Sequence, residues 1–278
     1  MIIIDLSQFL ISSVFAQVGS AKSVEIEENL LRHILFNSIR AVKVKYKDYG
    51  DVVIACDDKN YWRKDLFPYY KAHRKKARDE SPIDWNVVFE CLDKFKQELR
   101  DNFPYKVIQV PHVEADDIIA VLTKHYHHER VMIISSDKDF QQLQKYPFVG
   151  QYSPITKKEL HCSYPEQYLL EHIIKGDTGD GIPNCLSPDN TFVMGLRQRP
   201  LTAKRLQQIS YDTTSLDEAT RRNFLRNKAL IDFDEIPADV EKQILEAFET
   251  QEYGDRKNLF NYFIQYKMKN LMDSIGDF

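Results

Sequence analysis

The sequence predicts an α/β fold, in which the strands of one open sheet alternate with helices. Two observations lead to this prediction. Short apolar runs of strand length alternate with longer segments whose apolar residues recur at helical spacing. Four of the apolar runs are followed within a few residues by carboxylates, and ligands of open α/β sheets bind where the strands end. We therefore expect one acidic pocket along one edge of one sheet.

Four runs have the composition of strands buried on both faces. The clearest is residues 131–135, whose branched apolar side chains are followed by Asp137 and Asp139. The other three, each with the acids that follow it, are residues 2–4 (Asp5), residues 52–56 (Asp57 and Asp58) and residues 105–110 (Glu114, Asp116 and Asp117). Residues 148–152 are expected to form a further strand.

The remaining periodic segments predict helices. The best-marked start is at Ser81, which can cap a helix whose first residue is Pro82, with Asp84 returning the capping bond. That helix is expected to end near Asn102. The other predicted helices are residues 24–47, 114–128, 165–174, 239–248 and 258–275, with a short helical turn at residues 140–143.

The composition is that of an ordinary globular chain of 278 residues, of which 43% are apolar and 29% charged. No apolar run approaches the roughly 20 residues that a membrane span requires. The first segment lacks a basic stretch and is interrupted by Asp5 and Gln8, which argues against a signal peptide. The four cysteines form no CxxC pair, so we expect free thiols and a cytoplasmic location, in the host if a phage encodes the chain.

The acids point to metal chemistry. The net charge is −4, but without nine acids of the predicted pocket the chain would be net basic. These nine candidate metal ligands are Asp5, Asp57, Glu114, Asp116, Asp117, Asp137, Asp139, Asp177 and Asp180. So many carboxylates raise one another's pKa unless a cation compensates them. Mg²⁺ takes oxygen ligands, and two such ions about 4 Å apart can drive hydrolysis of a phosphodiester.

A basic and aromatic segment, residues 59–78, follows the second strand. Its cations would meet phosphates while its aromatic rings stack on bases, which favours single-stranded nucleic acid over the alternative of a solvated loop. Its candidate nucleic-acid contacts are Arg63, Lys64, Tyr70, Lys71, Arg74, Lys75, Lys76 and Arg78. A second basic region, residues 197–228, suits duplex phosphates, and a solvated surface explains it equally well.

Asp177 and Asp180 lie in a glycine-rich turn, residues 175–183, that allows a tight and exposed backbone. Taken alone, this turn is weak evidence for a metal site, because Gly-Asp turns are common. It does not fit a calcium EF-hand loop, which needs acids at alternate positions and a terminal Glu.

Taken in order, these motifs resemble those of the phage 5′-nucleases of the flap endonuclease superfamily. The matching elements run over nearly the whole chain and are IIIDLSQ, CDDKNYWRKDLFPYYKAHRKKAR, EADDIIAVL, IISSDKDFQQLQKYP, IIKGDTGD, LIDFDEIP and SIGDF. The resemblance implies a PIN-like 5′-nuclease fold, in which a mixed, mainly parallel sheet is flanked by helices and followed by a C-terminal helical region. It also implies a Mg²⁺-dependent 5′-to-3′ exonuclease and flap endonuclease that uses two ions, for which Mn²⁺ would substitute. Such an enzyme hydrolyses RNA·DNA hybrids and duplex DNA from a 5′ end and removes RNA primers in lagging-strand replication.

The resemblance assigns roles by position. The first metal would be held by Asp5, Asp57, Asp116 and Asp137, and the second, partly through water, by Asp139, Asp177 and Asp180, with Glu114 and Asp117 close by. Asp116 and Asp137 would serve catalysis together with Lys71 and Arg74, which match a basic pair beside the scissile phosphate. Tyr70 matches an aromatic on which the terminal base stacks. Residues 1–180 would form the catalytic domain, with an arch at 59–80, and residues 181–278 a helical duplex-binding region.

The sequence departs from the family at two places. Many relatives follow the second aspartate pair with a glycine-rich hairpin that binds duplex backbone, whereas residues 182–200 lack that glycine pattern. The first strand also begins at Met1 or Ile2, without the clamp-binding peptide that precedes it in some relatives. We expect a monomer that binds no membrane, whose protein partners would be a single-stranded-DNA-binding protein and a sliding clamp held elsewhere than at the N-terminus.

Two alternatives compete with the nuclease prediction. A haloacid-dehalogenase-like phosphatase would also place Asp5 after a strand, but it needs a second acid two residues later, where this chain has Ser7. A non-catalytic replication accessory would bind nucleic acid and use its acids for structural metal. The complete set of acids argues against this accessory, because an inactive relative would be expected to lack some of them.

Overall fold

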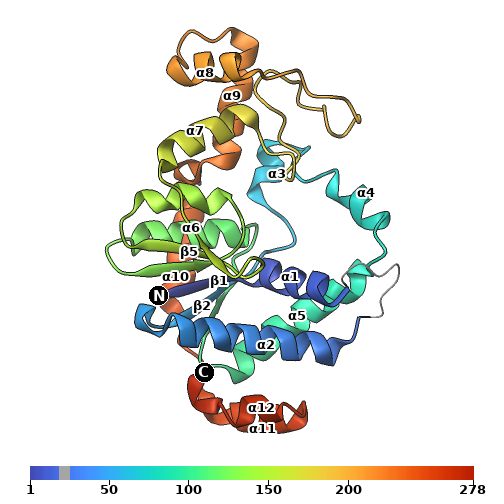
Figure 1. Ribbon diagram of the computed structural model, residues 1–278, viewed down its shortest axis with the longest axis vertical. Helices are drawn as coiled ribbons and strands as arrows, with labels where there is room; N and C mark the ends of the chain where they lie inside the picture. Colours follow the sequence, from blue (N-terminus) through green and yellow to red (C-terminus); the bar gives the residue numbers. More distant parts are fainter. Residues whose placement is uncertain (19–25) are drawn as a thin grey trace.

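The computed structural model describes residues 1–18 and 26–278, and its centre is one six-stranded sheet (Figure 1). The strand order is β3-β2-β1-β4-β5-β6. The strands are β1 (Ile2–Asp5), β2 (Val52–Ala55), β3 (Lys106–Ile108), β4 (Val131–Ile134), β5 (Val149–Ser153) and β6 (Lys158–Leu160). The first five strands pair in parallel, and β6 runs antiparallel to β5. The predicted mixed, mainly parallel sheet is therefore confirmed.

Two hydrophobic cores cover the two faces of the sheet. Ile2 and Ile4 of β1 point into one core and Ile3 into the other, because side chains alternate along a strand. The first core is covered by α1 (Leu6–Val18), α2 (Glu28–Lys45) and α5 (Trp85–Asn102), and the second by α6 (Ala115–His125) and α10 (Ala238–Thr250). Burial on both faces explains why the strands are continuous apolar runs in the sequence.

Apart from α10, the helices from α7 onward lie at the two ends of the molecule (Figure 1). At one end are α7 (Pro165–Lys175), α8 (Ala203–Tyr211) and α9 (Glu218–Ile231), and at the other are α11 (Leu259–Gln265) and α12 (Lys269–Met272). The final residue, Phe278, is buried in the first core against Phe103 and Phe263. The division at residue 180 stays a prediction, and part of the chain beyond it packs against the sheet. No helix within the described residues is long and apolar enough to cross a membrane.

Two short helices, α3 (Trp62–Leu66) and α4 (Arg74–Asp79), occupy the basic segment between β2 and α5. Figure 1 shows this segment leaving the end of β2, passing α3 beside the α7 end of the molecule and returning through α4 to α5. Short 3₁₀ helices complete the description at Lys47–Tyr49, Asp139–Lys145, Phe233–Glu235, Arg256–Asn258 and Ile275–Asp277.

Helix boundaries differ from the sequence prediction at several places. Helix α5 begins at Trp85, and its N-cap is Asp84, which accepts hydrogen bonds from the backbone N–H groups of Asn86 and Val87. The predicted cap at Ser81 is wrong, because its Oγ accepts from the N–H of Ile83 in a turn before the helix. The start predicted at residue 24 lies outside the described residues, and α2 begins at Glu28.

The helix predicted at residues 258–275 is also wrong as one continuous element. It is divided into α11, α12 and a 3₁₀ turn. Lys267 lies between α11 and α12 and has a left-handed φ of 55°, through which a right-handed helix cannot continue. Helix α1 was not predicted, because its apolar residues surround the helix on several sides and give no clear helical period.

Candidate active site

Aspartates from three strand ends and one helix start meet at the carboxyl edge of the sheet. Asp5 ends β1, Asp57 follows β2, Asp137 follows β4, and Asp116 lies in the first turn of α6. Burial, and next the charge of Asp57, raise the pKa of Asp5 to about 7. Burial and the charge of Asp137 raise the pKa of Asp116 well above its ordinary value. The structure thus brings the four residues predicted for the first metal into one site.

The backbone holds one oxygen of several site carboxylates. In each case a backbone N–H, usually from two or three residues further along the chain, donates to Oδ1 of the aspartate. The pairs, with the aspartate first, are Asp5–Gln8 (3.0 Å), Asp57–Ala115 (2.9 Å), Asp137–Asp139 (2.9 Å) and Asp177–Asp180 (2.9 Å). Fixing one oxygen orients the carboxylate and leaves Oδ2 for a cation or a side-chain donor.

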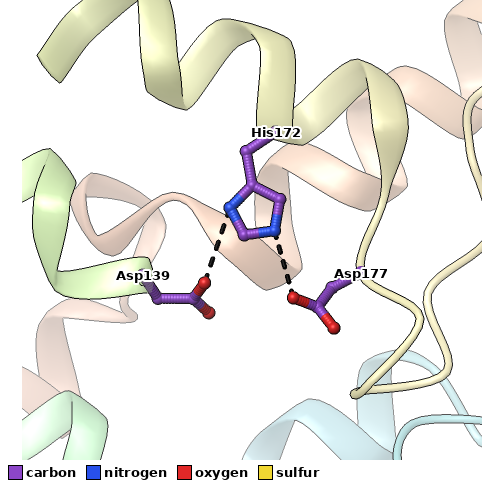
Figure 2. Close-up of side chains that lie close together, drawn as sticks. All are labelled: Asp139, His172 and Asp177. Atoms are coloured by element: carbon purple, nitrogen blue, oxygen red, sulfur yellow. Dashed lines mark hydrogen bonds and ion pairs between the residues drawn. The ribbon is translucent and has the colours of Figure 1, made fainter. Parts of the chain in front are cut away.

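A second group of acids lies beside the first and includes a histidine. Asp139 follows β4, Asp177 follows α7, and the ring of His172 lies between them (Figure 2). The Nε2 atom of His172 is 3.1 Å from Asp177 Oδ2, and its Nδ1 atom is 3.5 Å from Asp139 Oδ1. Burial alone would lower the pKa of His172, but the bond to Asp177 and the charge of Asp139 outweigh it and raise that pKa. Burial and the charge of Asp137 raise the pKa of Asp139.

Lys71 and Arg74 reach this site and pair with its acids. Lys71 Nζ lies 2.6 Å from Glu114 Oε1 and 3.7 Å from Asp180 Oδ2, and Arg74 forms an ion pair with Asp180. Their segment is also joined to the glycine-rich turn through the backbone, since the N–H of Lys71 donates to the carbonyl of Asp180 at 2.7 Å. Burial would lower the pKa of Lys71, but Asp180, Tyr70 and Glu114 raise it well above its ordinary value. The lysine is therefore charged.

Arg63 lies beneath the site instead of on the nucleic-acid surface predicted for it. Its side chain is 3% exposed and pairs with Glu114 at 3.0 Å and with Asp117 at 2.7 Å, while its Nε donates to the carbonyl of Leu230. Asp117 also accepts from the indole N–H of Trp62 and closes the capping box at the start of α6. In this arrangement Arg63 offers no surface to a phosphate, and both oxygens of Asp117 are engaged by Arg63 and Trp62.

Tyr70 is buried as well, with 3% of its surface exposed. Its hydroxyl lies within hydrogen-bond distance of Glu114 at 3.0 Å and Asp180 at 2.9 Å, and its ring packs in a small core with Phe67 and Ile173. The structure therefore does not present Tyr70 for stacking on a terminal base. The remaining predicted contacts, Lys64, Lys75, Lys76 and Arg78, lie on α3 and α4, where the three lysines are exposed and Arg78 is partly exposed.

The residues at this edge fit divalent cations. They supply carboxylate oxygens, which are the ligands that Mg²⁺ and Mn²⁺ prefer. Burial raises the pKa values of Asp5, Asp116, Asp137 and Asp139, so the site is short of positive charge. Lys71 and Arg74 form their ion pairs with Glu114 and Asp180, so these two cations do not directly neutralise the four aspartates.

The sequence did not predict His172. It is one histidine in a helix, and the four residues between it and Asp177 span the end of α7, so no fixed spacing links the two. The one sequence feature that pointed to this contact is Gly176, the glycine that ends α7. Its φ is 66°, and a Cβ there would overlap the carbonyl oxygen of Ile182. This turn brings Asp177 back to the side chain of His172.

Comparison with known protein families matches the whole chain. Residues 1–171 match the family described as 5′-3′ exonuclease, N-terminal resolvase-like domain, and residues 163–278 match the one described as T4 RNase H, C terminal. The chain is 34% identical to the ribonuclease H of Enterobacteria phage T4, in an alignment that covers 99% of this chain and 95% of that protein. The chain belongs to the 5′-3′ exonuclease family.

Other relatives of this family member are more distant. The flap endonuclease Xni of Shewanella oneidensis is 26% identical over 63% of this chain and 65% of its own length. Among solved structures, the T5 5′-exonuclease with bound zinc has a TM-score of 0.63 at 19% identity and covers 90% of this chain and 98% of its own. The T5 D15 flap endonuclease in a complex with DNA and metal ions has the same TM-score at 21% identity, covering 90% and 99%. These structures share the fold of this exonuclease-family chain.

Proposed function

We propose that the chain is a 5′-to-3′ exonuclease and flap endonuclease that depends on two Mg²⁺ ions, with Mn²⁺ able to substitute. Its substrates are RNA·DNA hybrids and duplex DNA with a 5′ end or flap, and its role is the removal of RNA primers in lagging-strand replication. The observation that carries this proposal is the convergence of strand-end aspartates beside Lys71 and Arg74. The similarity to the T4 and T5 nucleases supports the same reaction.

The acids divide into two ion sites. The first is assigned to Asp5, Asp57, Asp116 and Asp137, and the second to Asp139, Asp177 and Asp180. Bound divalent ions supply Lewis-acid activation of water and stabilise the leaving oxygen. Glu114 and Asp117 take a different role here from the one predicted, because Arg63, Tyr70 and Lys71 occupy their oxygens.

Lys71 and Arg74 are proposed to contact the reacting phosphate. The two residues are three positions apart in one short segment, and in this structure both pair with Asp180. An anionic phosphate near Asp180 would offer them a second acceptor. Two cations already positioned by ion pairs with site acids stabilise charge that develops in the transition state without the cost of reorganising solvent.

Cations further out are proposed to bind the nucleic-acid backbone. Lys64, Lys75, Lys76 and Arg78 line the segment that leaves the site through α3 and α4. On the α7 side, a pocket of about 520 Å³ between α8, α9 and the loop before them is lined by Arg199, Arg205 and Arg222. Part of the lining comes from residues 182–200, which lack the glycine pattern of many relatives, and the arginines favour a role in holding duplex phosphates.

The proposal extends to the setting in which the enzyme works. We propose that it acts as a monomer in the cytoplasm, that of the host if a phage encodes it. Contacts with a single-stranded-DNA-binding protein and with a sliding clamp stay predictions. Gel filtration of the chain alone and with each partner would test them, because a stable contact shifts the elution of both proteins.

The test of the proposed function uses two RNA·DNA hybrids of the same sequence, one with a free 5′ end and one closed into a covalent circle. With Mg²⁺, we expect the free-ended hybrid to be shortened from its 5′ end and the circle to be left intact. Chelation of the metal should abolish the reaction. Cutting of the circle at a similar rate, or shortening from the 3′ end, would overturn the proposal.

A further inference from the structure

The imidazole of His172 occupies an unusual place among the site carboxylates. It projects from the last turn of α7 into the space between Asp139 and Asp177 (Figure 2), and its side chain is 12% exposed. The ring has one carboxylate opposite each nitrogen, at 3.1 Å from Nε2 and 3.5 Å from Nδ1. A histidine that only filled space in a helix would not face two acids from two different segments.

The two ring nitrogens are bonded differently. Nε2 is within hydrogen-bond distance of Asp177 Oδ2, whereas Nδ1 is buried and has no hydrogen-bond partner among the residues that the structure describes. A neutral ring that donates from Nε2 directs the lone pair of Nδ1 toward Asp139 Oδ1. In this tautomer Nδ1 and Asp139 Oδ1, 3.5 Å apart, offer two donor atoms to one cation, which would replace the proton that a charged ring places between them.

The spacing of these two atoms suits one divalent ion. Metal–nitrogen and metal–oxygen bonds are about 2.0–2.2 Å long, so two ligands that subtend an angle near 110° at the ion lie roughly 3.5 Å apart. A ligating imidazole commonly donates its other N–H to a carboxylate, which fixes the ring and its tautomer. In this structure Asp177 is the carboxylate that would accept the N–H of His172 Nε2 and fix the ring.

We propose that His172 Nδ1 and Asp139 bind one divalent ion together, while Asp177 orients the imidazole. The position of this ion rests on the proposed function, which places the second metal at Asp139, Asp177 and Asp180, and the new element is a nitrogen ligand in that site. Imidazole favours Co²⁺ and Zn²⁺ over Mg²⁺. The second site is therefore more selective for such ions than the first, whose assigned ligands are all carboxylates.

The test is pulsed electron paramagnetic resonance on the full chain loaded with Mn²⁺, which detects nitrogen-14 bonded directly to the ion. We expect nitrogen coupling in the wild type and its loss in His172→Gln. The glutamine amide can still donate to Asp177, so the fold should survive. The matched control is His125→Gln, which removes an exposed histidine at the end of α6 and should keep the coupling.

Absence of nitrogen coupling in the wild type overturns the inference. This result is obtained on the wild type alone, so it does not depend on whether a variant folds. Coupling that persists in folded His172→Gln also overturns it. The same protein preparation is assayed for cleavage of a 5′ flap in Mg²⁺. Cleavage without nitrogen coupling rejects the histidine ligand and leaves the proposed function standing, whereas failure to cleave rejects the proposed function itself.

Discussion

Individual side chains at the site have different roles. Aspartates such as Asp137 use one oxygen to accept a backbone N–H and keep the other for a cation. Lys71 pairs with Glu114 and Arg74 pairs with Asp180, and Arg63 holds Glu114 and Asp117 from below. Substitutions at different positions should therefore change the cleavage rate, the affinity for substrate and the stability of the fold to different extents.

Asp137→Asn should remove cleavage and leave the fold intact. The Asn oxygen can still accept the N–H of Asp139, so the local turn is kept. Loss of the charge relieves repulsion of Asp116, so the variant without metal should melt at a higher temperature than the wild type. Thermal unfolding in EDTA, followed by circular dichroism, measures this change. Near wild-type cleavage in Mg²⁺ would show that Asp137 is not part of the active site.

Lys71→Ala should slow the chemical step more than it weakens binding. The lysine ammonium lies among the site acids, so its loss should cost about a hundredfold in single-turnover rate, a usual size for one stabilising group. The control is Lys75→Ala combined with Lys76→Ala, which removes exposed cations and should mainly raise the Kd for DNA, measured in Ca²⁺. The reverse pattern would mean that Lys71 serves only to bind the backbone.

The sequence predicted the site carboxylates better than it predicted their neighbours. Strand-end aspartates such as Asp5 and Asp137 could be placed together, because parallel strands end at one edge of the sheet. Arg63 and Tyr70 were expected to face nucleic acid. A basic and aromatic sequence does not reveal that Arg63, on the five-residue α3, and Tyr70, in the turn that follows α3, point inward. His172 needed the turn at Gly176, which depends on contacts distant in the sequence.

At the scale of elements, two segments far apart in the sequence are joined into one unit. The turn before α4 and the glycine-rich turn after α7 share a backbone hydrogen bond from Lys71 to Asp180 and a bond from Arg74 Nε to the carbonyl of Gly179. The geometry of the second ion site therefore depends on the shape of the glycine-rich turn as well as on its acids.

Gly176→Ala should destabilise the chain and weaken the second ion site. A Cβ there would overlap the carbonyl oxygen of Ile182, so the turn that carries Asp177 must shift. The matched control is Gly195→Ala, which has a similar φ of 65° but open space around it. We expect the unfolding free energy in urea to fall by about 1–3 kcal/mol more for Gly176→Ala than for the control, because overpacking adds to a backbone strain that both variants share. Equal losses would show that the turn is free to adapt.

Elements with a regular period or an abrupt change in composition were the predictable ones. All five predicted strands are present, although β3 is shorter than the predicted run. Helix α1 could not be seen in the sequence, because it is apolar on several sides, and the break at Lys267 could not be seen, because a left-handed residue other than glycine leaves no compositional mark. Both depend on packing of the first core instead of local propensity.

At the scale of the whole molecule, the buried acids set the pH dependence of stability. Burial raises the pKa of Asp5 from 3.8 to about 7, so between these values the folded chain binds more protons than the unfolded chain. The unfolding free energy of the metal-free chain therefore falls as the pH rises through this window. His172 acts in the same direction, because its pKa is also raised in the folded state.

The melting temperature in EDTA should accordingly be lower at pH 8 than at pH 5.5, and Mg²⁺ should raise it more at pH 8. Bound cations favour the ionised carboxylates and so reverse the cost of burying their charge. Differential scanning calorimetry at the two pH values, with and without Mg²⁺, measures both effects. In Asp5→Asn the difference between the two pH values should shrink. A metal effect independent of pH would mean that the ions bind away from these acids.

The most direct measurement of the central claim is the number of divalent ions that the carboxyl edge of the sheet binds. Isothermal titration with Mn²⁺ should show two binding events in the wild type. Asp116→Asn and Asp177→Asn should each remove or strongly weaken one event, and a different one, because the two residues are assigned to separate sites. Two unchanged events in both variants, or no binding in the wild type, would contradict a two-metal nuclease site at this edge.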